Sequence, residues 1–274
     1  MMDTHAFGVP ALPHGLLEFD VTRAQSARVC NYLLGGKDNF AVDRQAGDAL
    51  VKAVPRLRFL IAEHRRFVHR VARVLVVEDG IRQFIDIGAG IPLAPNLHEI
   101  AQRHAPQARV VYVDDDPLVL AHARALLRSH PAGRIEVAAA DLAEPVSVLS
   151  HQAVLATLDL GRPIGLILTG VLLADVVDPW SRVEQLREAM PSGSCLVVSH
   201  LTANFHPGEV GAAVAVAGGA GLSLVVRTEE AVRRLFGDWE LLEPGLVPVS
   251  DWRPASPVEN PAGACFWAGV ARKP

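Results

Sequence analysis

The sequence has few cysteines, few lysines and no long uninterrupted apolar stretch. The only cysteines among the 274 residues are Cys30, Cys195 and Cys265. They are far apart and odd in number, so neither a disulfide framework nor a metal-binding spacing is indicated. This cysteine usage favours a reducing compartment, and we expect a cytoplasmic protein. The first residues lack the pattern of a signal peptide and no apolar run could cross a bilayer, so no membrane association is expected.

Acidic residues slightly outnumber basic residues. Lysine and arginine number 26 against 30 aspartates and glutamates, for a net charge of −4. This balance, and the lack of a basic stripe, argue against a nucleic-acid partner. Half of the residues are hydrophobic, enough for one large domain or one domain with an appendage. The oligomeric state is left open.

From residue 81 onward, strand-like apolar segments alternate with helical segments. Strands are expected at residues 81–87, 109–113, 134–139, 164–169 and 195–199, and helices at 95–104, 117–128, part of 144–158, 181–190 and 207–218. This alternation predicts an α/β fold, with a doubly wound, mostly parallel sheet covered by helices on both faces. Two late strands, at 241–249 and 264–271, are expected around a proline-rich loop at 254–261.

The first 78 residues lack strand signals and read as helical. A short helix at 26–34 should end at the following glycine pair, and a second is expected at 43–54. Apolar residues and His64 then recur at helical spacing over residues 57–75. The arginines of that helix, including Arg65, are expected mostly on its solvent side. We therefore predict an N-terminal helical extension (1–78) and a sheet domain (79–274).

The segment FIDIGAGIP reads as a buried strand that runs into the glycine turn Gly88-Ala89-Gly90. Glycines let a ligand approach the main chain, and the next helix N-terminus adds a partial positive field. A dinucleotide site would want a third glycine where Leu93 stands, and Asp86 would repel a pyrophosphate. Asp86 suits a cofactor with a positive amino group, such as S-adenosylmethionine. A plain tight turn is the alternative.

Acids follow the next two strands. Asp114 ends the second strand and is the best acceptor for the hydroxyls of a ribose. Asp115 is a further candidate contact, although Asp115 and Asp116 could instead form a solvated loop in which Asp116 caps the next helix. After the third strand, Asp141 could accept the amine of adenine while the Leu142 main chain reads a ring nitrogen. Capping of the next helix is the alternative for Asp141.

The ends of the fourth and fifth strands should face the reacting centre, because ligands lie outside the carboxyl ends of parallel strands. Thr169 begins this edge and is a candidate cofactor contact. Asp175 and His200 are the candidates for a general base, and a structural role is the alternative for His200.

The segment RVCNYLLGGKDNF, at residues 28–40, clusters polar side chains and paired glycines on a short helix and turn. We interpret it as a lid over the cofactor, with Arg28, Tyr32, Gly35 and Asn39 as candidate contacts. An ordinary packing helix is the alternative.

With these residues assembled, the chain resembles the class I S-adenosylmethionine-dependent methyltransferases. More narrowly, it is similar to a bacterial family with the segments ARVYDYLLGGKDNF, FLDIGTGLP, VVYVDNDP and GLVPVSRWRP. The corresponding segments here are residues 27–40, 84–92, 110–117 and 245–254. The resemblance implies a Rossmann-like, seven-stranded sheet whose last strand is antiparallel.

The resemblance also implies a cofactor site and a reaction. Asp86, Gly88 and Gly90 would hold the methionine end of S-adenosylmethionine, Asp114 the ribose, and Asp141 with Leu142 the adenine. S-adenosylhomocysteine would be the product. The sequence departs from the family where Asn31 replaces the usual aspartate and where Leu173 replaces a common histidine.

Methyl transfer to a small-molecule acceptor is therefore the leading prediction, with no metal required. A catalytically silent protein that binds S-adenosylmethionine is the alternative from another class. A nicotinamide dehydrogenase is disfavoured by the acid before Gly88 and by the missing third glycine.

Overall fold

The computed structural model describes residues 20–170, 178–254 and 265–274. Its strands are β1 (Gln83–Ile87), β2 (Arg109–Asp114), β3 (Arg134–Ala139), β4 (Gly165–Leu168), β5 (Cys195–Leu201), β6 (Glu240–Leu241), β7 (Val247–Pro248) and β8 (Phe266–Arg272). They form one sheet in the order β3-β2-β1-β4-β5-β8-β6, with β7 also beside β8. Pairing is parallel from β3 to β5, whereas β8 is antiparallel to β5, as expected of the last strand.

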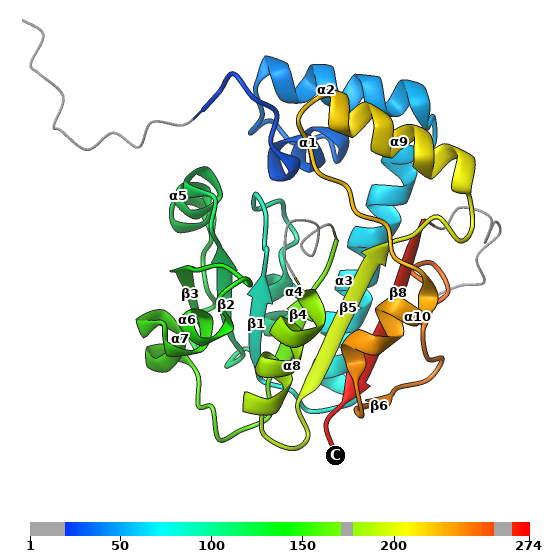
Figure 1. Cartoon of the computed structure of the whole chain (residues 1–274). Coiled ribbons are helices and arrows are strands. Elements are labelled where there is room, and N and C mark those ends of the chain that lie inside the picture. The colour runs from blue at the N-terminus through cyan, green and yellow to red at the C-terminus, as the bar shows by residue number, and fades with distance from the viewer. Residues whose placement is uncertain (1–19, 171–177, 255–264) are drawn as a thin grey trace, which may run out of the picture.

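Helices cover both faces of the sheet (Figure 1). They are α1 (Ser26–Leu33), α2 (Ala41–Ala53), α3 (Leu57–Val77), α4 (Leu97–His104), α5 (Pro117–Leu126), α6 (Pro145–Ser150), α7 (Gln152–Thr157), α8 (Pro179–Ala189), α9 (Pro207–Gly219) and α10 (Glu229–Arg233), which continues as the 3₁₀ turn η1 (Arg234–Phe236). One core joins α3 and α4 to the sheet, and a second joins α6, α7, α8 and α10 to its other face. The doubly wound α/β fold is confirmed.

Within the described ranges the sheet has eight strands, rather than the seven that the resemblance implies. The late strand expected at 241–249 is broken into β6 and β7. Pro244 and Gly245 stand between the two pieces; Pro244 has no N–H to give to a ladder. Gly245 has a φ of 89°, a left-handed conformation that a strand does not contain.

Three helices form a layer over one edge of the sheet, and we call α1, α2 and α9 the helical cap (Figure 1). The buried side of α9 presents Val210, Ala213 and Ala217, which share a core with Leu33 of α1 and Leu50 of α2. Since α9 follows β5, the cap combines segments from two distant parts of the chain. The domain boundary at residue 78 stays a prediction.

Helix α3 connects the cap to the sheet and is fixed by the late tryptophan segment. The Trp252 side chain is fully buried and meets the Phe67 ring edge-on at 5.6 Å. Arg70 donates to the Trp252 carbonyl at 3.0 Å. The fourth family segment therefore anchors α3. No helix in the described ranges is long and apolar enough to cross a membrane.

Candidate functional site

The glycine turn after β1 and the acidic turn after β2, which we call the first and second corners, meet at the carboxylate of Asp114. Strands β1 and β2 are neighbours, with Ile87 opposite Val113. Asp114, at the end of β2, accepts a hydrogen bond from the Gly90 N–H at 3.0 Å through Oδ2. Its Oδ1 accepts from the Asp116 N–H, also at 3.0 Å. Burial raises the pKa of Asp114, and these two hydrogen bonds oppose that rise.

The glycine turn has a conformation and an exposure that suit close approach of a ligand. Gly88 and Gly90 have φ values of 72° and 67°, which L side chains rarely adopt. A Cβ built on Gly90 would meet no atom within 4 Å. The main chain is therefore accessible at Gly90, as a bound cofactor requires.

Asp86 is a half-buried carboxylate beneath this turn that accepts no hydrogen bond from the described residues. Burial, and then the nearby charge of Asp114, raise its pKa to about 7, while Arg65 opposes the rise. Because burial and Asp114 disfavour the ionised form of Asp86, a positively charged ligand group nearby would stabilise that form. The site thus fits the amino group of S-adenosylmethionine.

Arg65 is not on the solvent side of α3, where its helical position placed it. The side chain is half-buried, donates to the Pro95 carbonyl at 3.0 Å and lies close enough to Asp86 to lower its pKa. Periodicity places a residue on a helix face, but it cannot show that this face meets the edge of the sheet.

The third corner is the turn after β3, which contains Asp141. It lies beside the second corner, because the Ala140 N–H donates to the Asp114 carbonyl at 3.2 Å. Asp141 is exposed, and its Oδ1 accepts from the Ala143 N–H at 2.9 Å in a turn that precedes α6. The N-cap residue of α6 is Glu144, and no side chain caps this helix, so Asp141 does not take the helix-cap alternative. Leu142 is buried in the core. The second carboxylate oxygen of Asp141 makes no described contact, so the proposed adenine role stays a prediction.

The structure separates the acids that follow Asp114. Asp116 caps α5, since its Oδ1 accepts from the Leu118 N–H at 2.7 Å. Asp115 is exposed. The helix-cap alternative for Asp116 is confirmed.

The lid segment lies next to the corners but presents apolar side chains to them. Ala27 and Phe40 pack against Ile91, Leu118 and Val119, which flank the glycine turn and begin α5. Among polar contacts, His122 Nε2 of α5 is 3.6 Å from Asp38 Oδ1.

The structure directs Arg28 into the cap rather than toward the cofactor corners. Its guanidinium is buried and forms an ion pair with the equally buried Asp43 at 3.0 Å. It also donates to the carbonyls of Asp20 and Arg23. These contacts use all three guanidinium nitrogens.

The other polar lid residues are likewise engaged within the cap. Tyr32 donates to Asp48 at 2.6 Å. Asn39 donates to Asn31 Oδ1 at 2.9 Å and to the Gly36 carbonyl at 3.0 Å. Gly35 takes a φ of 82° in the turn. The structure thus does not bring Arg28, Tyr32 or Asn39 to the glycine corner, because each finds its partner within α1, α2 or their connection.

His200 has no free ring nitrogen. Nδ1 donates to the Leu201 carbonyl at 2.9 Å, which leaves Nε2 to accept from Arg227. Burial lowers the pKa of His200 to about 4. This geometry supports the structural alternative. Thr169 is half-buried without a described polar contact, and Asp175 and Leu173 lie outside the described residues.

A polar chain at the ends of β4 and β5 was not found from the sequence. The Gly170 N–H donates to Ser199 Oγ at 3.0 Å, and Ser199 Oγ lies 2.6 Å from His64 Nε2. The His64 ring also packs on Phe266, with ring centroids 4.9 Å apart. His64 falls on the apolar stripe of α3, so its spacing indicated packing alone.

Comparison with known proteins agrees with this geometry. The chain matches the family described as S-adenosyl methyltransferase over residues 15–274. A DUF574 family protein from Streptomyces avermitilis is similar at 40% identity and a TM-score of 0.89, covering 93% of this chain and 99% of that one. A proposed methyltransferase from Thermobifida fusca is similar at 38% identity and a TM-score of 0.85, covering 93% and 96%.

No curated protein matches the chain. The family match spans nearly all of the sequence, and both related structures align over almost their full length. The chain therefore belongs to the S-adenosyl methyltransferase family, with S-adenosylmethionine as its cofactor and S-adenosylhomocysteine as the product.

Proposed function

We propose that this methyltransferase binds its cofactor across the β1 and β2 corners and methylates a small molecule. The observation that carries the proposal is the pair of neighbouring carboxylates, Asp86 and Asp114, beneath the open turn at Gly90. One suits an ammonium group and the other a ribose diol. The small-molecule acceptor is supported by the helical cap, which covers the carboxyl edge of the sheet (Figure 1), and by the net negative charge.

Each residue has a defined task in this proposal. Asp114 retains lone pairs beyond its two main-chain contacts, and these accept the ribose hydroxyls. Asp86 pairs with the amino group of the methionine end. The second oxygen of Asp141 and the main chain of Leu142 receive the adenine. When bound, the cofactor supplies a methyl group already activated by its sulfonium. The protein then contributes mainly alignment and exclusion of water.

S-adenosylhomocysteine should protect the protein against thermal unfolding, and NAD should not. A ligand at one hundred times its dissociation constant stabilises the native state by about 2.7 kcal/mol. For a chain of this size we expect a rise in melting temperature of roughly 5–10 °C. Equal protection by both ligands, measured by differential scanning fluorimetry, would rule out the assignment of the two carboxylates.

The affinity for S-adenosylmethionine should rise with pH through the pKa of Asp86. The pKa in the folded protein, about 7, lies above its ordinary value, so much of Asp86 is protonated below neutrality. Binding of a cationic group then requires loss of a proton, which weakens binding. Between pH 5.5 and 7.5 we expect affinity to increase about tenfold, as measured by calorimetry.

The Asp86→Asn variant is the matched control for this pH dependence. An amide of the same shape does not titrate in this range, so its affinity should be low and nearly constant. A variant that keeps the wild-type pH profile would assign the dependence to another group.

A further inference from the structure

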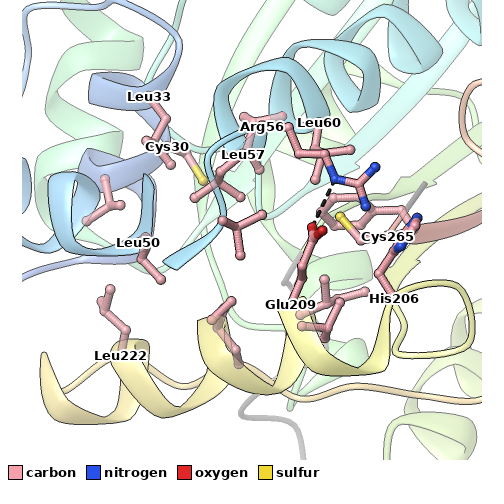
Figure 2. Close-up of a pocket in the computed structure, with 18 of the residues that line it drawn as sticks. Cys30, Leu33, Leu50, Arg56, Leu57, Leu60, His206, Glu209, Leu222 and Cys265 are labelled. Atoms are coloured by element: carbon pink, nitrogen blue, oxygen red, sulfur yellow. Dashed lines mark hydrogen bonds and ion pairs between the residues drawn. The ribbon is translucent and has the colours of Figure 1, made fainter. Parts of the chain in front are cut away.

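An apolar cavity of about 80 Å³ lies beneath the helical cap (Figure 2). Its walls come from all three cap helices, from α3, and from the segments around β5 and β8. They include Leu33, Leu50, Leu60, Ala213, Leu222 and Phe266. Protein interiors rarely keep apolar voids much larger than a water molecule, and an engineered apolar cavity of about 150 Å³ stays dry and binds benzene or xenon. A ligand that fills it is therefore expected to be apolar over most of its surface.

The cavity lies at the same edge of the sheet as the cofactor corners. Leu201 and Phe266, which face each other across β5 and β8, both line it. Leu201 ends β5, and β5 is separated from β1 only by β4. The carboxyl ends of these parallel strands meet at one edge, so the cavity and the glycine turn lie on the same side of the molecule.

His64 does not line the cavity itself but contacts both a residue of its wall and the segment that follows β4. Its ring packs on Phe266 in the cavity wall, and a Cβ built on Gly170 would lie 3.6 Å from its Cε1. Ser199 holds the Nε2 side of the ring at 2.6 Å. Within the described residues, the imidazole thus has one anchored nitrogen, and its other nitrogen, Nδ1, has no hydrogen-bond partner.

The charged groups in the cavity wall neutralise each other. Arg56 Nε and Glu209 Oε2 are 2.9 Å apart, and Figure 2 shows the pair beside Cys265 and His206. An ionised ligand would lose its hydration here without gaining an unpaired counter-charge. The wall therefore favours an uncharged ligand.

We propose that this cavity holds the body of the methyl acceptor, an uncharged and largely apolar molecule, and that His64 Nδ1 receives its hydroxyl or amine. The inference rests on the proposed function. In the transfer, the acceptor's oxygen or nitrogen gains the methyl carbon, and the electron pair of the broken carbon–sulfur bond stays on sulfur. His64 Nδ1 accepts a hydrogen bond from the acceptor and orients it, while Nε2–H donates to Ser199. Because burial lowers the pKa of His64 to about 4, the ring stays neutral and the acceptor's proton is released to water.

Binding of 4-alkylphenols tests the cavity, with calorimetry in saturating S-adenosylhomocysteine. From phenol to 4-ethylphenol, affinity should rise about fourfold per added methylene. 4-Ethylphenol should bind several-fold more tightly than 4-ethyltoluene, which has a methyl group in place of the hydroxyl. His64→Leu should abolish that preference, and His64→Gln should restore part of it. No phenol binding, or a preference unchanged in His64→Leu, would overturn the inference.

A matched pair of variants on α9 locates the binding. Ala213 lines the cavity, whereas Ala215 is exposed on the same helix. Ala213→Phe should weaken 4-ethylphenol binding at least tenfold, and Ala215→Phe should not. If Ala213→Phe does not fold, the smaller substitution Ala213→Leu replaces it in the same measurement. Equal binding of 4-ethylphenol by the wild type and the cavity variant would overturn the inference.

Affinity for S-adenosylhomocysteine, measured separately, distinguishes the two proposals. If it stays within twofold in the α9 variants while phenol binding is lost, both proposals are supported. If S-adenosylhomocysteine binds and the phenols do not, only the acceptor cavity fails. If S-adenosylhomocysteine does not bind the wild type, the proposed cofactor site fails, and with it the role of the cavity in methyl transfer.

Discussion

Replacing Asp114 with alanine should weaken the binding of S-adenosylmethionine at least tenfold. The carboxylate accepts hydrogen bonds from the Gly90 and Asp116 N–H groups, so it fixes the relative positions of both corners. The substitution would remove the acceptor for the ribose and release both N–H groups. A charge-assisted hydrogen bond contributes about 1.5–3 kcal/mol, and one such loss already corresponds to tenfold or more. Isothermal titration calorimetry measures the change directly.

Two further variants show whether the effect is local. Asp114→Asn keeps one acceptor oxygen and should fall between the wild type and Asp114→Ala. Glu136→Ala removes a carboxylate from the neighbouring strand β3, where it pairs with Arg134 at the surface, and should leave affinity unchanged. Wild-type affinity in a folded Asp114→Ala protein would exclude Asp114 from the site.

Replacing Arg28 with alanine should lower the free energy of unfolding by about 3–5 kcal/mol, the usual cost of breaking a buried ion pair. Both side chains of the Arg28–Asp43 pair are at most 2% exposed. The variant would leave the Asp43 carboxylate buried without its counter-charge, and it would remove the contact of Arg28 with the Phe40 ring. Urea unfolding, followed by circular dichroism, measures the loss.

The double variant Arg28→Met, Asp43→Leu is the control for charge burial. It removes both charges while keeping apolar volume, so it should recover a large part of the lost stability. A loss below 1 kcal/mol in Arg28→Ala, together with lost cofactor affinity, would instead return Arg28 to the role of a cofactor contact.

The frame of the fold could be predicted from local signals. Apolar runs located β1 to β5, and the order of strand, glycine turn, helix and acid located the corners around Gly88 and Asp114. Those signals suffice because each element is specified by its own few residues. Local signals do not predict the break between β6 and β7, because Pro244 and Gly245 lie inside one mostly apolar segment.

The partners of polar side chains could not be predicted in the same way. The sequence predicts Arg28 and Tyr32 as ligand contacts, because a polar cluster on a short helix has the same composition whether it binds a ligand or the next helix. Their partners, Asp43 and Asp48, lie on α2. His64 shows the converse, since its contact with Ser199 joins residues 135 positions apart.

The cap is a composite, and this limits how the chain can be divided. Helices α1 and α2 precede the sheet, whereas α9 follows β5, and Arg56 and Glu209 link the two parts. Deleting the leading helices would expose the apolar side of α9 to water and open the cavity. A chimera meant to exchange acceptor preference with a relative must therefore transplant both segments together, because the two separate parts of the chain form one structural unit.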